Sequence, residues 1–170
     1  NNPKKEIITE SEINNLDKLY EIFLSNPFAR SLLENSKKEF SCRWNSSIEN
    51  IRCKAKADGY SEKDNFVFDL KTFDSKNFIK DSIEKYRYHV QAVHYSEGFQ
   101  VDNFYIIALS KNFDCCEVIE LSQSLLDEGK YLRVKNLCDF NEFFTNEGVE
   151  GWDFPKIINF NSYDEVEFDL

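Results

Sequence analysis

The sequence predicts an α/β fold in which helices flank a mixed central sheet. Segments whose apolar residues recur at helical spacing are interspersed with segments whose apolar residues alternate or run continuously. Hydrophobic residues make up 41% of the chain and Phe alone occurs 16 times, so the charged fraction of 31% indicates a polar exterior and not disorder. A length of 170 residues suits one domain, and we expect residues 1–170 to form a single one.

The N-terminal third of the chain contains two expected helices and two expected strands. Helical spacing over residues 11–24 predicts a first helix, which ends before Pro27, and residues 28–33 form a short second helix. Alternating apolar residues then predict strands at 40–44 and 51–57, which we expect to pair with each other.

The later part of the chain contains one long expected helix. Asp74 and Ser75 offer its N-terminal cap, and Gly98 ends it after about Glu97. The other expected elements are a loop at 59–65, strands at 65–75, 101–109 and 117–121, a helix at 122–144, and a short strand or extended arm at 152–160.

The strand at 65–75, NFVFDLKTFDS, carries two charges inside an apolar run. Because side chains alternate between the faces of a strand, Asp69 and Lys71 project to the same face. Such a pair is most often an ordinary ion pair on a half-exposed strand, and this interpretation stays open.

Asp58, at the end of the preceding strand, favours a functional interpretation of the same pair. Two carboxylates near one lysine repel each other unless a divalent cation lies between them, and oxygen ligands suit Mg²⁺ or Mn²⁺. A regular hairpin register does not set Asp58 opposite Asp69, so we expect the two strands to diverge or bulge near Gly59.

These residues, together with YRYHVQAVHY further along, resemble the PD-(D/E)xK nuclease superfamily and, within it, the RecE-type exonuclease VIII nuclease domain. Upstream, EFSCRWNSSIENIRCKAKAD resembles another segment of that family, and GWDFPKI resembles its C-terminal tryptophan region. The resemblance spans most of the chain. It implies the restriction-endonuclease-like fold, a mixed central sheet flanked by helices.

The resemblance also implies the catalytic and metal-binding residues. The carboxylates of Asp58 and Asp69 and the backbone carbonyl of Leu70 would be metal ligands. Lys71 would orient or deprotonate the attacking water, or stabilise charge. Glu39 would complete the catalytic site as an outer acidic group, although an acidic residue at a strand start is usually only solvated.

Three residues of YRYHVQAVHY share one helix face, since Gln91 and Tyr95 are four apart and Tyr88 is three residues earlier. The resemblance places Gln91 and Tyr95 beside the active site, and an amide with two phenols suits contacts to DNA. The alternative is that both tyrosines are core aromatic residues. His89 and His94 lie five apart, off a common face, and we expect them to be structural or surface residues.

As a function, the resemblance implies hydrolysis of DNA phosphodiester bonds with Mg²⁺ or Mn²⁺, by an exonuclease acting from duplex ends in recombination or repair. It further implies a homo-oligomer, and we add a single-strand annealing protein as an expected partner. The net charge of −10 supports a second interpretation, because phosphate binding normally rests on a positive patch. In that case the scaffold holds a DNA end or a protein partner without significant catalysis. Coincidental motif matches in an ordinary α/β domain are the third possibility.

Some classes of function are disfavoured by the remaining residues. No stretch approaches the ~20 apolar residues of a membrane span, and the first residues lack the apolar part of a secretory signal. We therefore expect a cytoplasmic protein without a membrane partner. The five cysteines, two of them adjacent, predict free thiols, and their spacing disfavours a zinc or iron–sulfur site.

Overall fold

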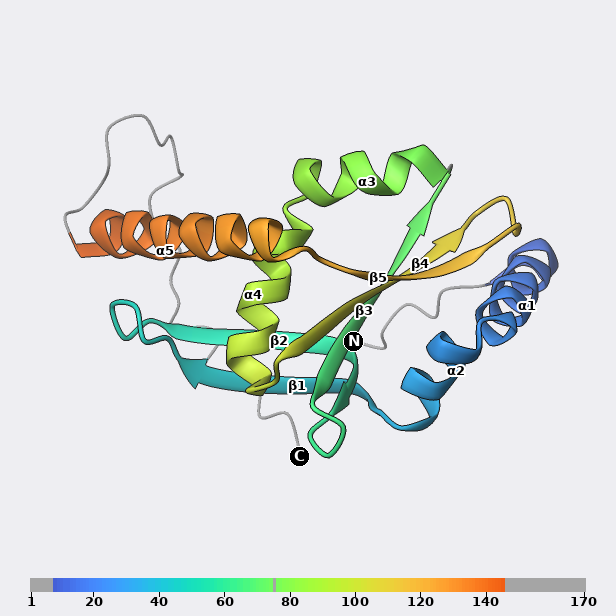
Figure 1. Ribbon diagram of the computed structural model, residues 1–170, viewed down its shortest axis with the longest axis horizontal. Helices are drawn as coiled ribbons and strands as arrows, with labels where there is room; N and C mark the ends of the chain where they lie inside the picture. Colours follow the sequence, from blue (N-terminus) through green and yellow to red (C-terminus); the bar gives the residue numbers. More distant parts are fainter. Residues whose placement is uncertain (1–7, 75, 146–170) are drawn as a thin grey trace, which may run out of the picture.

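The computed structural model describes residues 8–74 and 76–145, which form a five-stranded mixed sheet with helices on both faces (Figure 1). The predicted fold class is confirmed. The helices are α1 (Glu10–Ser25), α2 (Pro27–Glu34), α3 (Lys76–Lys85), α4 (Tyr88–Phe99) and α5 (Gln123–Thr145). The strands are β1 (Lys37–Asn45), β2 (Arg52–Ser61), β3 (Phe66–Phe73), β4 (Asn103–Ser110) and β5 (Cys116–Glu120).

The first two helices begin and end at side chains that cap them. Thr9 and Glu12 form a capping box at the start of α1. Asn26 ends α1, and its side-chain oxygen accepts hydrogen bonds from the backbone N–H groups of Phe28 and Ala29 at 3.0 and 3.1 Å. One asparagine therefore separates the two predicted helices, both of which are confirmed.

The strands lie in the order β1-β2-β3-β4-β5. All neighbours are antiparallel except β3 and β4, which are parallel and are joined through α3 and α4. The predicted pairing of the first two strands is confirmed, with Phe40 opposite Ala57. The predicted loop at 59–65 is wrong at its start, because β2 continues to Ser61 and the turn occupies 62–65.

The long helix predicted after β3 is two helices. Arg87 has a φ of 58°, in the left-handed region, and this breaks the helix between α3 and α4. Gly98 does not end α4, which continues to Phe99 and is followed by Gln100 with a φ of 55°. A Cβ at position 98 would lie 2.5 Å from the Trp44 ring, so this glycine permits close packing of Trp44 on α4.

The remaining strands and helix agree with the sequence. β4, β5 and α5 lie at the expected positions 101–109, 117–121 and 122–144, and α5 continues through Gly129. The expected element at 152–160, the GWDFPKI segment and Ser75 lie outside the described residues. In the part of the chain that the structure describes, no helix has the length and apolar character needed to cross a membrane.

The two faces of the sheet bury separate cores. One core packs α1 and α2 on the sheet and is built around Phe23, Phe66, Phe68 and Ile107. The other packs α3, α4 and α5 on the opposite face, and Val67, Phe73, Ala92, Phe99 and Ile106 are among its buried members. Successive β3 side chains alternate between these cores, as a strand between two helical layers requires.

Candidate active site

The ladder between β2 and β3 ends just before the two predicted aspartates. Its last pair is Gly59 with Phe68, so Asp58 and Asp69 stand opposite each other one step further along. The predicted register was wrong on this point, whereas the predicted divergence near Gly59 is confirmed. An oxygen of Asp58 accepts a hydrogen bond from the backbone N–H of Leu70 at 2.6 Å, which satisfies a donor that no β2 carbonyl reaches.

Asp69 is a buried carboxylate on the α4 side of the sheet, with 6% of its surface exposed. Its Oδ1 accepts a hydrogen bond from the side-chain amide of Gln91 at 2.9 Å, and its Oδ2 forms an ion pair with Lys71. Burial raises the pKa of the Asp69 carboxyl above its ordinary value, and the charge of Asp58 adds to this, while Lys71 and Gln91 oppose it.

Lys71 lies between a carboxylate and an aromatic ring. Its ammonium group pairs with Asp69 on the same strand and sits 4.8 Å from the ring centroid of Tyr88, the first residue of α4. Its side chain is 22% exposed, so solvent reaches it on one side. Asp69 and Lys71 thus share one face of β3, as the alternation of the strand predicted.

The face of α4 that carries Tyr88, Gln91 and Tyr95 covers the site. The Tyr95 hydroxyl donates to the backbone carbonyl of Lys56 at 2.9 Å, two residues before Asp58. Burial raises the pKa of the Tyr95 phenol, which keeps it in its donor form. Both tyrosines also pack against the core, so the core interpretation holds for parts of these rings. Their role as DNA contacts stays a prediction.

Glu39 falls opposite Asp58 in the register of β1 with β2, because Lys38 pairs with Gly59 and Phe40 with Ala57. Its φ of 53° is unusual for a strand residue. Its exposed carboxylate pairs with Lys56. Glu39 thus lies beside Asp58 in the sheet, yet its side chain pairs with Lys56, and its catalytic role stays a prediction.

Comparison with known families identifies the domain. A family model described as a PDDEXK-like domain of unknown function (DUF3799) matches residues 1–147. The chain belongs to this family. The sequence-based resemblance to the PD-(D/E)xK class is therefore confirmed. Among curated protein sequences, none matches the chain significantly.

Solved structures share the fold of this PDDEXK-like domain. A protein from Eubacterium rectale described as a candidate exonuclease has a TM-score of 0.68 and 15% identity, over 96% of this chain and 69% of that one. A phage-related exonuclease from Haemophilus somnus has a TM-score of 0.50 and 15% identity, over 83% and 75% of the two chains. At these identities the likeness establishes the fold.

The donor set of the PDDEXK-like domain fits a hard divalent cation. Asp58 and Asp69 supply carboxylate oxygens from facing positions, and the buried Asp69 Oδ2 pairs with the Lys71 ammonium group. Oxygen donors of this type suit Mg²⁺ or Mn²⁺. No group of three or more His, Cys, Asp or Glu side chains that could hold a metal occurs in residues 8–74 and 76–145, so further ligands would be backbone carbonyls, such as Leu70, and water.

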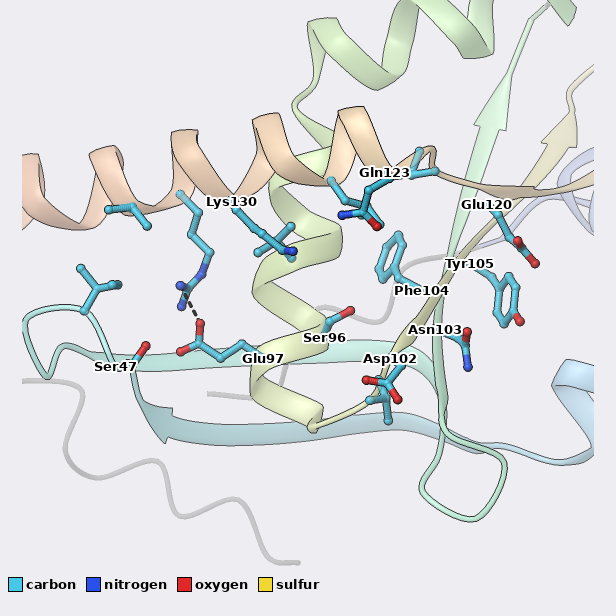
Figure 2. Close-up of a pocket in the computed structure, with 17 residues that line it drawn as sticks. Ser47, Ser96, Glu97, Asp102, Asn103, Phe104, Tyr105, Glu120, Gln123 and Lys130 are labelled. Atoms are coloured by element: carbon cyan, nitrogen blue, oxygen red, sulfur yellow. Dashed lines mark ion pairs between the residues drawn. The ribbon is translucent and has the colours of Figure 1, made fainter.

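Two hollows adjoin α4, and the larger of these two is not lined by Asp58 or Asp69. It has a volume of about 640 Å³ and lies between α4, α5 and β4, with Glu97, Phe104, Gln123 and Lys130 among its lining residues (Figure 2). A second hollow of about 390 Å³ between α4 and α5 is lined partly by Gln91 and Tyr95. Neither hollow is lined by Asp58, Asp69 or Lys71.

Sequence analysis missed a buried polar cluster that joins α4 to α5 and β1. Arg133 on α5 pairs with Glu97 at 2.6 Å, the ion pair dashed in Figure 2. The Arg133 Nε donates to His94 Nδ1 at 3.3 Å. The Trp44 indole N–H also donates to Glu97 at 3.1 Å. His89 is fully buried, with Nδ1 3.2 Å from the Ile83 carbonyl. Both histidines are thus structural, as predicted, but no local pattern indicates their partners.

Proposed function

We propose that this PDDEXK-like domain hydrolyses DNA phosphodiester bonds, with Asp58, Asp69 and Lys71 as the residues that carry the chemistry. The observation that supports this most strongly is the convergence of the three side chains. Two carboxylates from adjacent strands stand opposite each other beside a partly exposed ammonium group. A structural ion pair requires only Asp69 and Lys71, whereas Asp58, which also accepts the Leu70 N–H, adds a second carboxylate charge beside Asp69.

In this proposal Lys71 positions the attacking water. An ammonium group donates up to three hydrogen bonds, and one directed at a water oxygen fixes its approach to the phosphorus. The water oxygen forms a bond to phosphorus while the bond from phosphorus to the leaving sugar oxygen breaks. One proton of the water is released, and the leaving oxygen gains a proton, so the reaction balances as hydrolysis.

Asp58, Asp69 and the Leu70 carbonyl would hold Mg²⁺ or Mn²⁺. When bound, such a cation supplies positive charge to a phosphate oxygen and so stabilises the transition state. The chain itself contributes the rigid placement of these oxygens: Gln91 fixes Asp69 by a hydrogen bond, and the Leu70 N–H fixes Asp58. Glu39 would act as an outer acidic group.

The finer parts of the proposal rest on the resemblance and on the two similar structures described as exonucleases. For the activity, they are exonuclease action from duplex ends and a part in recombination or repair. For the assembly, they are a homo-oligomer and cooperation with a single-strand annealing protein. For the chain, they are a single domain over residues 1–170. Gln91 and Tyr95 would lie along the path of the DNA, with Tyr88 beside Lys71 on the same face of α4.

The test compares linear 5′-phosphorylated duplex DNA with closed circular DNA, each with Mg²⁺ or with EDTA. We expect loss of the linear substrate alone, dependent on the metal and abolished in Lys71→Ala. Lys63→Ala is the matched control, since Lys63 is an exposed lysine in the turn of the same hairpin. Cleavage that survives Lys71→Ala would contradict the proposed site.

The net charge of −10 supports a second candidate, a module that binds DNA ends or a protein without significant catalysis. Folded wild-type protein that retains linear duplex in a gel-shift assay, yet cleaves neither substrate with Mg²⁺ or Mn²⁺, would favour that candidate. Thermal stabilisation by Mg²⁺ that Asp69→Ala abolishes would instead favour the nuclease.

A further inference from the structure

Among the residues that the structure describes, the aromatic ring of Tyr88 is one of two contacts that hold the ammonium group of Lys71. The Lys71 nitrogen lies 4.8 Å from the ring centroid, within the ~6 Å at which a cation is attracted to the face of an aromatic ring. The other contact is the ion pair with Asp69 Oδ2. Lys71 is only 22% exposed, so solvent screens these attractions less than on an open surface.

The two contacts differ in what happens when a cation occupies the site. Under the proposed function Asp69 would also bind Mg²⁺ or Mn²⁺, and a second positive charge on the same carboxylate weakens its attraction for Lys71. The ring of Tyr88 is neutral and is not a ligand for a hard cation. When the cation binds, the contact of the Tyr88 ring with Lys71 therefore persists, whereas Asp69 divides its attraction between Lys71 and the cation.

We propose that Tyr88 is a positioning residue, whose ring face holds the Lys71 ammonium group in place for catalysis. This inference rests on the proposed function, and it assigns Tyr88 a role through the protein in place of a direct contact to DNA. It is the ring, and not the hydroxyl, that carries the role.

The neighbouring tyrosine on the same helix face shows the difference between ring and hydroxyl. The Tyr95 hydroxyl donates to the Lys56 carbonyl at 2.9 Å, so removing that oxygen removes a specific bond to β2. The hydroxyl of Tyr88 has no hydrogen bond within residues 8–74 and 76–145. Tyr88→Phe would therefore keep the ring contact with Lys71, which we propose is what matters at this position. Tyr95→Phe would instead lose the hydrogen bond to the Lys56 carbonyl.

The residues on either side of Tyr88 restrict where its ring can lie. Arg87, in the left-handed region, turns the chain so that α4 begins with Tyr88 above β3. His89, the next residue, is fully buried and contacts the Ile83 carbonyl. The Tyr86 ring lies 5.8 Å from the Tyr88 ring on the side of α3. A residue that lies between a fixed backbone turn and a buried neighbour can hold a positioning side chain in one place.

The first experiment measures kcat and KM on linear duplex DNA for Tyr88→Phe, Tyr88→Leu and the control Tyr20→Leu, an exposed tyrosine on α1. We expect Tyr88→Leu to lower kcat by roughly tenfold without raising KM, and Tyr88→Phe and the control to match wild type. A rise in KM with unchanged kcat, or equal losses in the Phe and Leu variants, would overturn the proposal.

The second measurement does not depend on activity. Lysines are dimethylated with ¹³C, which preserves their charge, and the Lys71 methyl signal is assigned with Lys71→Arg in EDTA buffer. We expect an upfield ring-current shift for Lys71 that Tyr88→Phe retains and Tyr88→Leu abolishes. A Lys71 signal that is the same in all three proteins would overturn the contact. An intact shift in a wild-type protein that cleaves no DNA would overturn the proposed function while supporting the contact.

Discussion

The two halves of β3 serve opposite purposes. Residues 66–68 pair with β2 on one side and β4 on the other, and all three side chains are buried. Residues 69–73 continue to pair with β4, but the ladder to β2 has ended. In this second half Leu70 is 39% exposed and Lys71 reaches solvent, while the carboxylate of Asp58 takes the place of a strand partner.

The difference shows how one strand can be both anchored and open to polar groups. The first half anchors the chain in two cores, and the second half uses that rigidity to hold polar groups along an opened edge. In a fully paired ladder a β2 carbonyl would bind the Leu70 N–H, and the Asp58 carboxylate would lose that partner. The candidate site is therefore a local departure from regular strand pairing. The fully paired first half of β3 lies next to it and supports it.

The largest expected effect comes from a substitution in residues 66–68, the half of β3 that anchors the strand in the cores. Phe68 is completely buried between the sheet and the first two helices. Phe68→Ala leaves a cavity and should lower the free energy of unfolding by about 3–5 kcal/mol, measured by urea denaturation. Thr72→Ala, an exposed residue of the second half, is the control and should change stability by less than about 0.5 kcal/mol. Similar losses in both variants would contradict the comparison.

A smaller effect concerns the last pair of the ladder. A Cβ at position 59 would overlap the Phe68 ring, so Gly59→Ala should cost about 1–3 kcal/mol of unfolding free energy through overpacking. Because the two residues touch, the cost should fall when Phe68 is shortened to leucine. Urea denaturation of the single and double variants measures this coupling, and simple additivity would show that the overlap is relieved elsewhere.

A third effect tests residues 69–73 of β3, where the ladder to β2 has ended. Asp58→Ala removes the acceptor for the Leu70 N–H and should lower the free energy of unfolding by about 1 kcal/mol. Asp58→Asn keeps an oxygen acceptor and should cost less, yet both variants should lose cleavage. Hydrogen exchange of the Leu70 amide is the direct measurement, with the Ile106 amide in the paired strand β4 as reference. Unchanged protection of Leu70 in Asp58→Ala would contradict the assigned hydrogen bond.

The smallest expected effect is a pH dependence of stability in EDTA. Since the pKa of Asp69 is raised by burial, the folded state binds its proton at pH values where the unfolded state has released it. The wild type should therefore lose stability as pH rises from about 4 through the raised pKa. Asp69→Asn lacks this titration, so its stability relative to wild type should rise with pH over that window. A relative stability that falls with pH would contradict the assigned direction.

The sequence by itself predicted most of the elements, the fold class and the family. Helical and alternating patterns are set by local geometry, so the bounds of α1, α2, β4, β5 and α5 were predicted closely. The shared face of Asp69 and Lys71 follows from alternation alone. Motif spacing then predicted the family, because acid, acid and lysine in that order depend on chain position and not on contacts.

Only the tertiary structure decided how those residues meet. The length of β2 and the turn at 62–65 set Asp58 opposite Asp69, and the left-handed Arg87 split one predicted helix into two. The burial of Asp69 and the ring of Tyr88 over Lys71 depend on α4 packing across β3. Such features arise from contacts between segments far apart in the chain, whose free energies outweigh local propensity and leave no periodic trace in the sequence.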